Sequence, residues 1–265
     1  MKIRNKFFAL FLSLAMFFAF MPTFAYADET PSAEGSGSGA SATEEKAENS
    51  SLTNSGEETS ETADAAVSIG DKSFATLPEA VAAAKDGDTI TLLKDAEGSG
   101  VKLEAKDAKA LTFDFGGHTY TMNGEAVGST GYESQAMHFE KGAAITLKNG
   151  TLKVAGGAMG IQNYADLTLQ DFNVDASMNA KCQYVMSNNN GDVKILGSSS
   201  IKAAKGQNAF DVCVTTHYPD GARVTVDTTG EIVGNIQYDT WGSIPENNKT
   251  ALTIKNGKFD GTFDI

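Results

Sequence analysis

The sequence predicts an all-β fold, a right-handed parallel β-helix with three strands per coil and a short N-terminal capping helix. One phrase occurs twice, as "ITLKNGTLKV" from Ile145 and as "LTIKNGKFDG" from Leu252. Six short runs recur along the chain, and upstream and downstream companion strands make the repeating unit three short strands in 22 to 34 residues. These runs share one alternating pattern and begin at Leu111, Ile145, Leu167, Val193, Val224 and Leu252.

The length of this repeat distinguishes the predicted fold from other all-β folds. The starts of the six runs are 34, 22, 26, 31 and 28 residues apart. A propeller blade needs four strands in about 40 residues or more, and the hairpins of an immunoglobulin-like sandwich give no such repetition. Coils stacked about 4.8 Å apart pair every backbone and bury a continuous core. The copies of the phrase are therefore expected on the same wall. The upstream strands are predicted at 136–139, 159–162, 183–187, 210–214 and 235–238.

A short helix is predicted before the first coil. Thr76 and Glu79 have capping-box spacing, and Pro78 falls in the first turn. An apolar stripe at i, i+3, i+4 and i+7 follows, formed by Leu77, Ala80, Val81 and Ala84. Such a helix covers a sheet end that would otherwise be an exposed edge.

Two segments resemble a known group of proteins. "FATLPEAVAAAKDGDTITLL" resembles the N-terminal cap of the pectate-lyase-like right-handed β-helix superfamily. "IKNGKFDGTFDI" is similar to coils of large secreted bacterial surface proteins of the adhesin type. The resemblance covers roughly residues 67–265. It implies the fold but no single activity, because the superfamily includes lyases, hydrolases, esterases and inert stalks.

Three segments are predicted along the chain. Residues 1–27 combine a basic start, an apolar run and the small-residue site Ala25–Ala27, which indicates a signal peptide and a secreted or cell-surface protein. A retained N-terminal anchor is the alternative. Residues 28–66 contain ten acidic residues and no aromatic one, which predicts a disordered linker, either a spacer or a solubilising leader. Residues 67–265 form the β-helix domain.

Charge excludes one class of partner. The whole chain has a net charge of −13, and without the signal peptide 18 basic residues face 34 acidic ones, a net charge of −16. Such a balance argues against binding to nucleic acid and to anionic lipid. No cofactor is expected, because no phosphate-binding glycine loop with a lysine occurs.

Catalytic motifs are mostly missing from the sequence. The polysaccharide lyases of the superfamily pair calcium-binding aspartates with a basic residue, and Arg223 is the only arginine after the signal peptide. Asp192 and Asp227 are its conceivable neighbours. The aspartate, histidine and arginine motifs of the related polygalacturonases and esterases do not occur. No catalytic residue is therefore assigned, and Arg223 stays the only candidate.

No metal site is predicted either. His118, His138 and His217 have no zinc-ligand spacing. Asp86 and Asp88 flank a glycine as in calcium loops, but a helix stop followed by an Asx turn explains them equally.

Two cysteines are a disulfide candidate. Cys182 and Cys213 lie 31 residues apart, the same offset as Val193 and Val224 in the following strands. Equal offsets would stack them closely enough for a bridge. Two free, buried thiols are the alternative.

The loops between upstream and middle strands are the predicted binding edge. Insertions at one repeat position project from one edge of a solenoid. Aromatic rings beside amides and carboxylates suit a glycan, whereas ordinary polar loops are the alternative. The candidate ligand-binding residues are Tyr164, Asn189, His217, Tyr218, Asp220, Asp239 and Trp241.

These features together favour a non-enzymatic, exported surface protein, a stalk or adhesin-like module that binds an extracellular glycan or a host surface. A β-helix enzyme acting on polysaccharide is the alternative. The chain reaches its last residue within a coil, at "FDGTFDI". An open strand edge there predicts self-association, or a longer chain that continues the stack.

Overall fold

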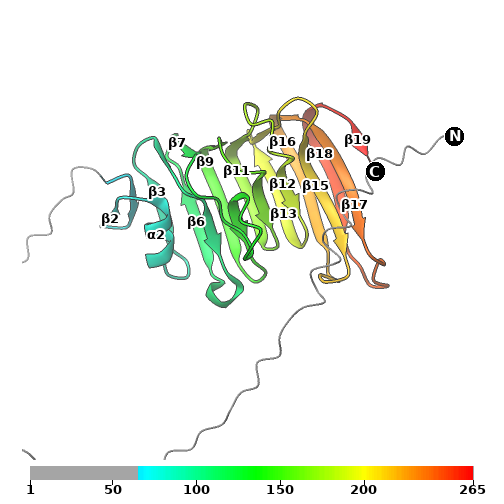
Figure 1. The fold of residues 1–265 in the computed structure, drawn as a ribbon, viewed down its shortest axis with the longest axis horizontal. Helices are drawn as coiled ribbons and strands as arrows, with labels where there is room; N and C mark the ends of the chain where they lie inside the picture. Colours follow the sequence, from blue (N-terminus) through cyan, green and yellow to red (C-terminus); the bar gives the residue numbers. More distant parts are fainter. Residues whose placement is uncertain (1–64, 265) are drawn as a thin grey trace, which may run out of the picture. The chain divides into compact units, whose positions relative to one another are not determined.

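The computed structural model describes residues 65–264, which belong to one compact unit. The predicted signal peptide and nearly all of the predicted linker lie outside the described residues. The described chain is all-β and winds into a parallel β-solenoid of about seven turns. Figure 1 shows its strands lying side by side in sequence order along the long axis.

Two hydrogen-bonded sheets form the walls of the solenoid. The first sheet has 12 strands in the described chain, and most neighbours in it are parallel. Its members are β1 (Val67–Ile69), β2 (Lys72–Phe74), β3 (Thr89–Leu92), β4 (Ala96–Gly98), β6 (Ala110–Asp114), β7 (Thr119–Met122), β9 (Ala144–Val154), β11 (Asp166–Asp175), β13 (Gly191–Gly197), β14 (Ser200–Lys202), β16 (Ala222–Val233) and β18 (Ala251–Asp260).

The second sheet contains the predicted upstream strands. It has seven strands, and each pairs in parallel with the strand of the next coil. They are β5 (Val101–Leu103), β8 (Gln135–Phe139), β10 (Met159–Asn163), β12 (Tyr184–Asn188), β15 (Asn208–Thr215), β17 (Asn235–Trp241) and β19 (Phe263–Asp264).

The six alternating runs form one column of the first sheet. Each run's first residue pairs with that of the next, which confirms that copies of the repeated phrase share a wall. The column contains Leu111, Ile145, Leu167, Val193, Val224 and Leu252. All but Leu252 are buried.

Middle and downstream runs are not separate strands in every coil. In β9, β11, β16 and β18 they form one continuous strand, whereas β13 and β14 remain distinct. Two of the long strands pass through a left-handed residue, Asn149 at φ 55° and Asp171 at φ 53°. Asn and Asp tolerate this conformation better than other non-glycine residues.

One short helix precedes the first long strands. Helix α2 (Leu77–Ala83) starts with the predicted capping box, in which Thr76 and Glu79 each accept the other's backbone N–H. Leu77, Ala80 and Val81 are buried in the common core, and the helix contacts β1, β2, β3 and β5. A single 3₁₀ turn, η2 (Ala105–Asp107), follows β5.

The interior is apolar along its length. Phe115 and Phe172 from different coils meet edge to face with ring centroids 4.9 Å apart.

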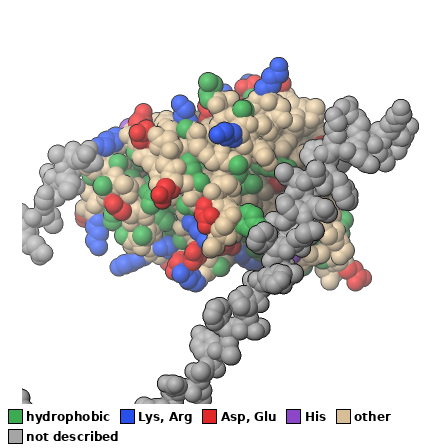
Figure 2. Space-filling view, viewed as in Figure 1, with side chains coloured by type: hydrophobic (Ala, Val, Ile, Leu, Met, Phe, Trp, Pro, Cys, Tyr) green, Lys and Arg blue, Asp and Glu red, His purple; other side chains and the backbone are tan. Residues whose placement is uncertain are grey.

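Acidic and basic side chains are intermixed on the face of the molecule that Figure 2 shows. No helix of the described residues is long and apolar enough to cross a membrane.

Candidate functional site

The connections from the second sheet to the first lie along one edge of the solenoid. Because the strands are stacked in parallel register, the loops β8–β9, β10–β11, β12–β13, β15–β16 and β17–β18 follow one another along this edge. A pocket of about 510 Å³ runs across them. Each of the five connections, or the strand end beside it, contributes to its lining, and we call it the edge pocket. Its polar lining residues are Lys141, Tyr164, Asp166, Asn190, Asp220, Arg223 and Lys249.

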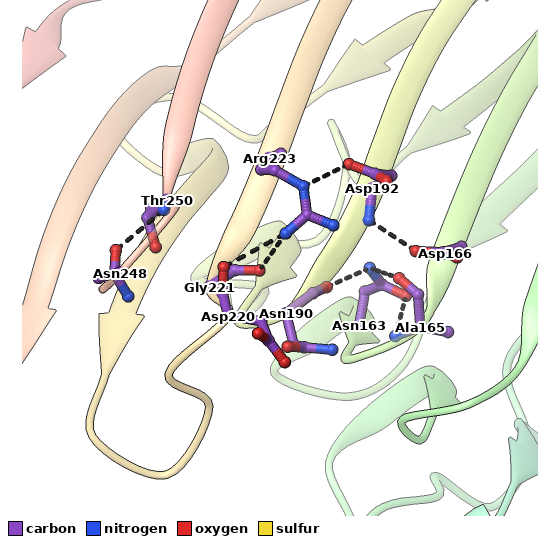
Figure 3. A network of polar contacts seen from close by, with 10 residues as sticks. All are labelled: Asn163, Ala165, Asp166, Asn190, Asp192, Asp220, Gly221, Arg223, Asn248 and Thr250. Atoms are coloured by element: carbon purple, nitrogen blue, oxygen red, sulfur yellow. Dashed lines mark hydrogen bonds and ion pairs between the residues drawn. The ribbon is translucent and has the colours of Figure 1, made fainter. Parts of the chain in front are cut away.

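Arg223 is the centre of the charges in the edge pocket. Its Nε lies 2.6 Å from Asp192 Oδ1 on the neighbouring strand, and its Nη1 donates to the carbonyl oxygens of Asp220 and Gly221 (Figure 3). The hydrogen bond from Arg223 holds the pKa of Asp192 below its usual value. The same ion pair raises the pKa of Arg223, so the guanidinium stays charged. Asp227, the other conceivable partner, lies opposite Leu196 instead.

Two lysines add positive charge at the rim. Lys141 Nζ lies 3.4 Å from Asp220 Oδ2, and both side chains are more than half exposed. Lys249 lines the pocket and makes no ion pair within residues 65–264. Asp166 accepts the backbone N–H of Asp192 through Oδ1 at 2.7 Å. The pocket therefore offers both cationic donors and carboxylate acceptors to a ligand.

Asparagines fix the floor of the pocket. Asn163 is fully buried, and its side chain bonds the backbone N–H and the carbonyl oxygen of Ala165. Asn190, from the next coil, donates Nδ2 to the Tyr164 carbonyl oxygen at 2.8 Å, and its own carbonyl oxygen accepts from Asn163 Nδ2 (Figure 3). Asn190 Oδ1 is buried and has no partner within the described chain. A buried acceptor without a donor costs free energy, so a donor reaching this atom would stabilise the site.

Two tyrosines flank the pocket on the side of the second sheet. The rings of Tyr164 and Tyr218 lie 4.8 Å apart at 37°, and the ring of the buried His138 lies 5.8 Å from Tyr164. Burial raises the pKa of both tyrosines, so both are neutral. His138 Nε2 is 2.7 Å from Glu140 Oε1. The pair presents a partly exposed aromatic surface beside the charged groups.

A polar column crosses the outer face of the second sheet next to these tyrosines. Its residues are paired from coil to coil and alternate with inward apolar side chains. They are His138, Gln162, Ser187, Asp211 and Gln237. Asp211 accepts from Asn188 N at 2.7 Å and from Ser187 Oγ at 3.0 Å. Burial nevertheless raises the pKa of Asp211 to about 7.

The structure brings together only part of the predicted binding set. Tyr164, Tyr218 and Asp220 meet at the edge pocket. Asp239 and Trp241 instead pair with each other on β17, where the indole Nε1 donates to Asp239 Oδ2 at 3.0 Å. The remaining two bond to residues at the end of the strand that precedes their loop. Asn189 donates to Ser187 Oγ, and His217 donates its backbone N–H to Thr215 Oγ1.

Sequence reasoning missed three charged residues of the pocket. Lys141, Asp166 and Lys249 lie in the predicted edge loops but were not candidates. Their position in those loops was the available signal. Charged side chains occur in most exposed loops, however, so nothing in their own identity marks them as ligand contacts.

The equal spacing of the two cysteines does not stack them. Both are free and buried. Asn188 lies opposite Val212, an offset of 24 residues, whereas Val193 lies opposite Val224, an offset of 31. Three of the seven extra residues extend β15 beyond Val212, and the other four lengthen the β15–β16 connection. Cys182 therefore precedes its strand while Cys213 lies near the end of the neighbouring one. This register does not place them within the roughly 6 Å Cα distance of a bridge.

The acidic turn after helix α2 bonds to backbone. Asp86 Oδ1 accepts the N–H of Ala110, and Asp88 Oδ2 accepts that of Lys85, both at 2.7 Å. Within residues 65–264 no group of three or more His, Cys, Asp or Glu side chains could hold a metal ion. The hydrogen bonds of Asp86 and Asp88 are those of a turn after the helix, which was the alternative interpretation to a calcium loop.

Comparison with known proteins gives no relative for this chain. No protein-family model matches it, and neither a curated protein nor a solved structure does. Function is therefore argued from the edge pocket itself.

Proposed function

We propose that this protein is an exported, cell-surface β-helix module that binds extracellular glycans along its loop edge without cleaving them. The observation that carries the proposal is the edge pocket, which combines residues from five consecutive coils. With coils about 4.8 Å apart, five coils span about 19 Å. A groove of this length suits a chain-like ligand better than a small compact one.

The chemistry of the lining fits a polyhydroxylated ligand. Arg223, Lys141 and Lys249 donate hydrogen bonds, while Asp166 and Asp220 accept them. Sugar hydroxyls do both, so they can meet both kinds of group. The tyrosine pair beside the pocket offers the flat apolar face on which a pyranose ring stacks. A purely apolar ligand would leave these charges desolvated and unpaired.

The finer architecture is part of the proposal. We infer a right-handed β-helix with three walls per coil, of the pectate-lyase-like type, in which helix α2 covers the first coil. The parallel register of the two sheets and the capping box of the helix support this inference. Residues 1–27 direct export, and residues 28–66 hold the domain away from its attachment surface. Nucleic acid is not a partner, because the chain is strongly acidic.

A glycan array followed by titration of the best ligand tests the proposed function. Lys249→Ala and Arg223→Ala should each weaken binding at least about tenfold, because each removes a charged donor from the pocket. Lys205→Ala is the matched control, an exposed lysine in the β14–β15 connection, and should bind like the natural chain. Loss of binding in the control, or no glycan bound by the natural chain, would overturn the proposal.

A polysaccharide-cleaving enzyme is the second candidate, and one observation favours it. Carboxylates and lysines from neighbouring coils do converge beside Arg223. A charged guanidinium there could neutralise the carboxylate of an acidic sugar. Lyase and reducing-sugar assays on a polysaccharide panel distinguish the two functions. Turnover that disappears in Arg223→Ala would replace the binding module by an enzyme.

A further inference from the structure

One acceptor in the edge pocket is buried without a donor. The Asn190 side chain lines the pocket and the residue is 5 % exposed, yet its Oδ1 has no hydrogen-bond partner among residues 65–264. The bond from Nδ2 to the Tyr164 carbonyl oxygen fixes the orientation of the amide, because a flipped amide would set Oδ1 against that oxygen. A ligand group that reaches Oδ1 must therefore donate a hydrogen bond.

The next coil lies directly beside this acceptor. Gly191 pairs with Ala222, so Asn190 lies next to the bend formed by Asp220 and Gly221 (Figure 3). In the same place Gly191 N donates to the Gly221 carbonyl oxygen at 3.2 Å. The side chains of Asn190 and Asp220 thus belong to the same part of the pocket.

An exposed ion pair bridges this part of the pocket. Lys141 Nζ lies 3.4 Å from Asp220 Oδ2, although the two residues are 79 positions apart in the chain. Two connections lie between theirs along the edge, and these carry Tyr164 and Asn190. The paired side chains are 51 % and 61 % exposed, so the pair is weak. A ligand can therefore separate it and reach Asn190 Oδ1 at little cost in free energy.

The formal charges of the pocket cancel. Three cationic side chains and two carboxylates line it, and the carboxylate of Asp192, bonded to Arg223, is the third. No excess charge attracts an ammonium or a carboxylate group of a ligand. The donor that fits Asn190 Oδ1 is therefore a neutral one. The cationic residues are Lys141, Arg223 and Lys249, and the lining carboxylates are Asp166 and Asp220.

We propose that the edge pocket selects glycans that contain an N-acetylated amino sugar, an inference that rests on the proposed glycan-binding function. An acetamido group is neutral and combines an N–H donor, a carbonyl acceptor and a methyl group. Its N–H bonds Asn190 Oδ1, and its carbonyl oxygen accepts from Lys249, which makes no ion pair within residues 65–264. Its methyl group packs on Ala143 and Ala144, which supply apolar lining. A hydroxyl in place of the acetamido group can make only the first of these contacts.

Matched oligosaccharides test this selection on the full chain. Linear tetramers of glucose, glucosamine and N-acetylglucosamine share one backbone and differ only at carbon 2. In calorimetric titrations the acetylated tetramer should bind about tenfold more tightly than either counterpart, as one additional net hydrogen bond predicts. A glycan array gives the same comparison for other sugar series. Glycans bound without preference for the acetylated form would overturn this inference alone, whereas no glycan bound at all would overturn the proposed function with it.

Two variants test whether the preference arises at these contacts. Lys249→Met removes the donor to the acetyl carbonyl oxygen and should lower the preference for the acetylated over the glucose tetramer about fivefold or more. Lys205→Met is the matched control, an exposed lysine outside the pocket, and should keep the full preference. Asn190→Asp should shift the preference to the glucosamine tetramer at about pH 6, where the amine is protonated and a carboxylate binds it.

Lys249→Met decides the matter even if Asn190→Asp fails to fold, because Lys249 is exposed and its replacement leaves the core unchanged. An undiminished preference for the acetylated tetramer in Lys249→Met would overturn the proposal.

Discussion

Arg223 and Asp192 are bonded across two neighbouring coils, with Nε and Oδ1 2.6 Å apart, although 31 residues separate them in the chain. Register alone makes them neighbours, since β13 and β16 pair them directly. Their side chains are 34 % and 52 % exposed. Arg223 lines the edge pocket, and Asp192 bonds to it from the neighbouring strand. Solvent weakens the contribution of so exposed a pair to folding.

We expect Asp192→Asn to change the free energy of unfolding by less than about 1 kcal/mol, as for other exposed ion pairs. Urea denaturation at low and at high salt measures this. Glycan binding should change much more, because Arg223 loses the carboxylate that holds it in place. A loss of several kcal/mol would show that the pair is structural and not part of a binding surface.

Asp211 should make stability depend on pH. Its pKa is about 7 in the folded chain, against about 3.9 when unfolded. Between these values the folded state keeps a proton that the unfolded state has lost, so stability falls as pH rises from about 4 to about 7. Each pKa unit corresponds to about 1.4 kcal/mol.

Asp211→Asn should remove this dependence, so that the natural chain loses stability relative to the variant as pH rises. The urea midpoints of the natural chain and the variant are compared at about pH 4.5, 6 and 7.5, which covers the range from about pH 4 to 7 in which the dependence is expected. Asp227→Asn, on the exposed part of β16, is the matched control. A constant difference between natural chain and Asp211→Asn would contradict the expectation.

Phe172 should contribute strongly to the core. It is fully buried and meets Phe115 edge to face. Phe172→Ala should cost about 3–5 kcal/mol, the usual loss for a buried aromatic ring. Met178→Ala, at an 89 % exposed position, should stay within about 0.5 kcal/mol. Chemical denaturation of both variants checks the contrast, and a Phe172→Ala loss as small as the control's would argue against this packing.

Gly150 should not tolerate a side chain. A Cβ there would collide with Phe115 Cβ and with the carbonyl oxygen of His118. Gly150→Ala should cost about 1–3 kcal/mol, as overpacking does. At Gly156 the nearest atom would be Met122 Sδ at an ordinary 3.5 Å, so Gly156→Ala should be neutral or slightly stabilising. Equal stabilities of the two variants would show that the close approach at Gly150 does not exist.

The sequence predicted the walls well because stacking imposes a repeating pattern. Leu111 and Leu252 belong to one column, as their shared alternation indicated. The argument from equal offsets failed for Cys182 and Cys213. The number of residues between two strands can change from coil to coil while the pairing of the strands stays the same. Counting along the chain therefore measures register only between strands joined by equal loops.

The binding edge was predicted in its location but only partly in its membership. Tyr164 and Asp220 were found because an aromatic ring and a carboxylate in the edge loops suit a glycan. Lys249 was not predicted, because its sequence context does not distinguish it from other lysines in polar loops. Trp241 bonds to Asp239 on its own strand instead of lining the pocket. Which side chains converge depends on loop conformation, and no repeat specifies that.

Pairing between successive coils has a consequence for how the molecule comes apart. Within the described chain every inner winding is held by a neighbour on both sides, whereas β2 and β18 each have a neighbour on one side only. In such linear arrays stability is roughly a sum of local terms, so opening should start at the ends of the stack and travel inward. Amide hydrogens there should exchange with deuterium first, and those of β9 and β11 last.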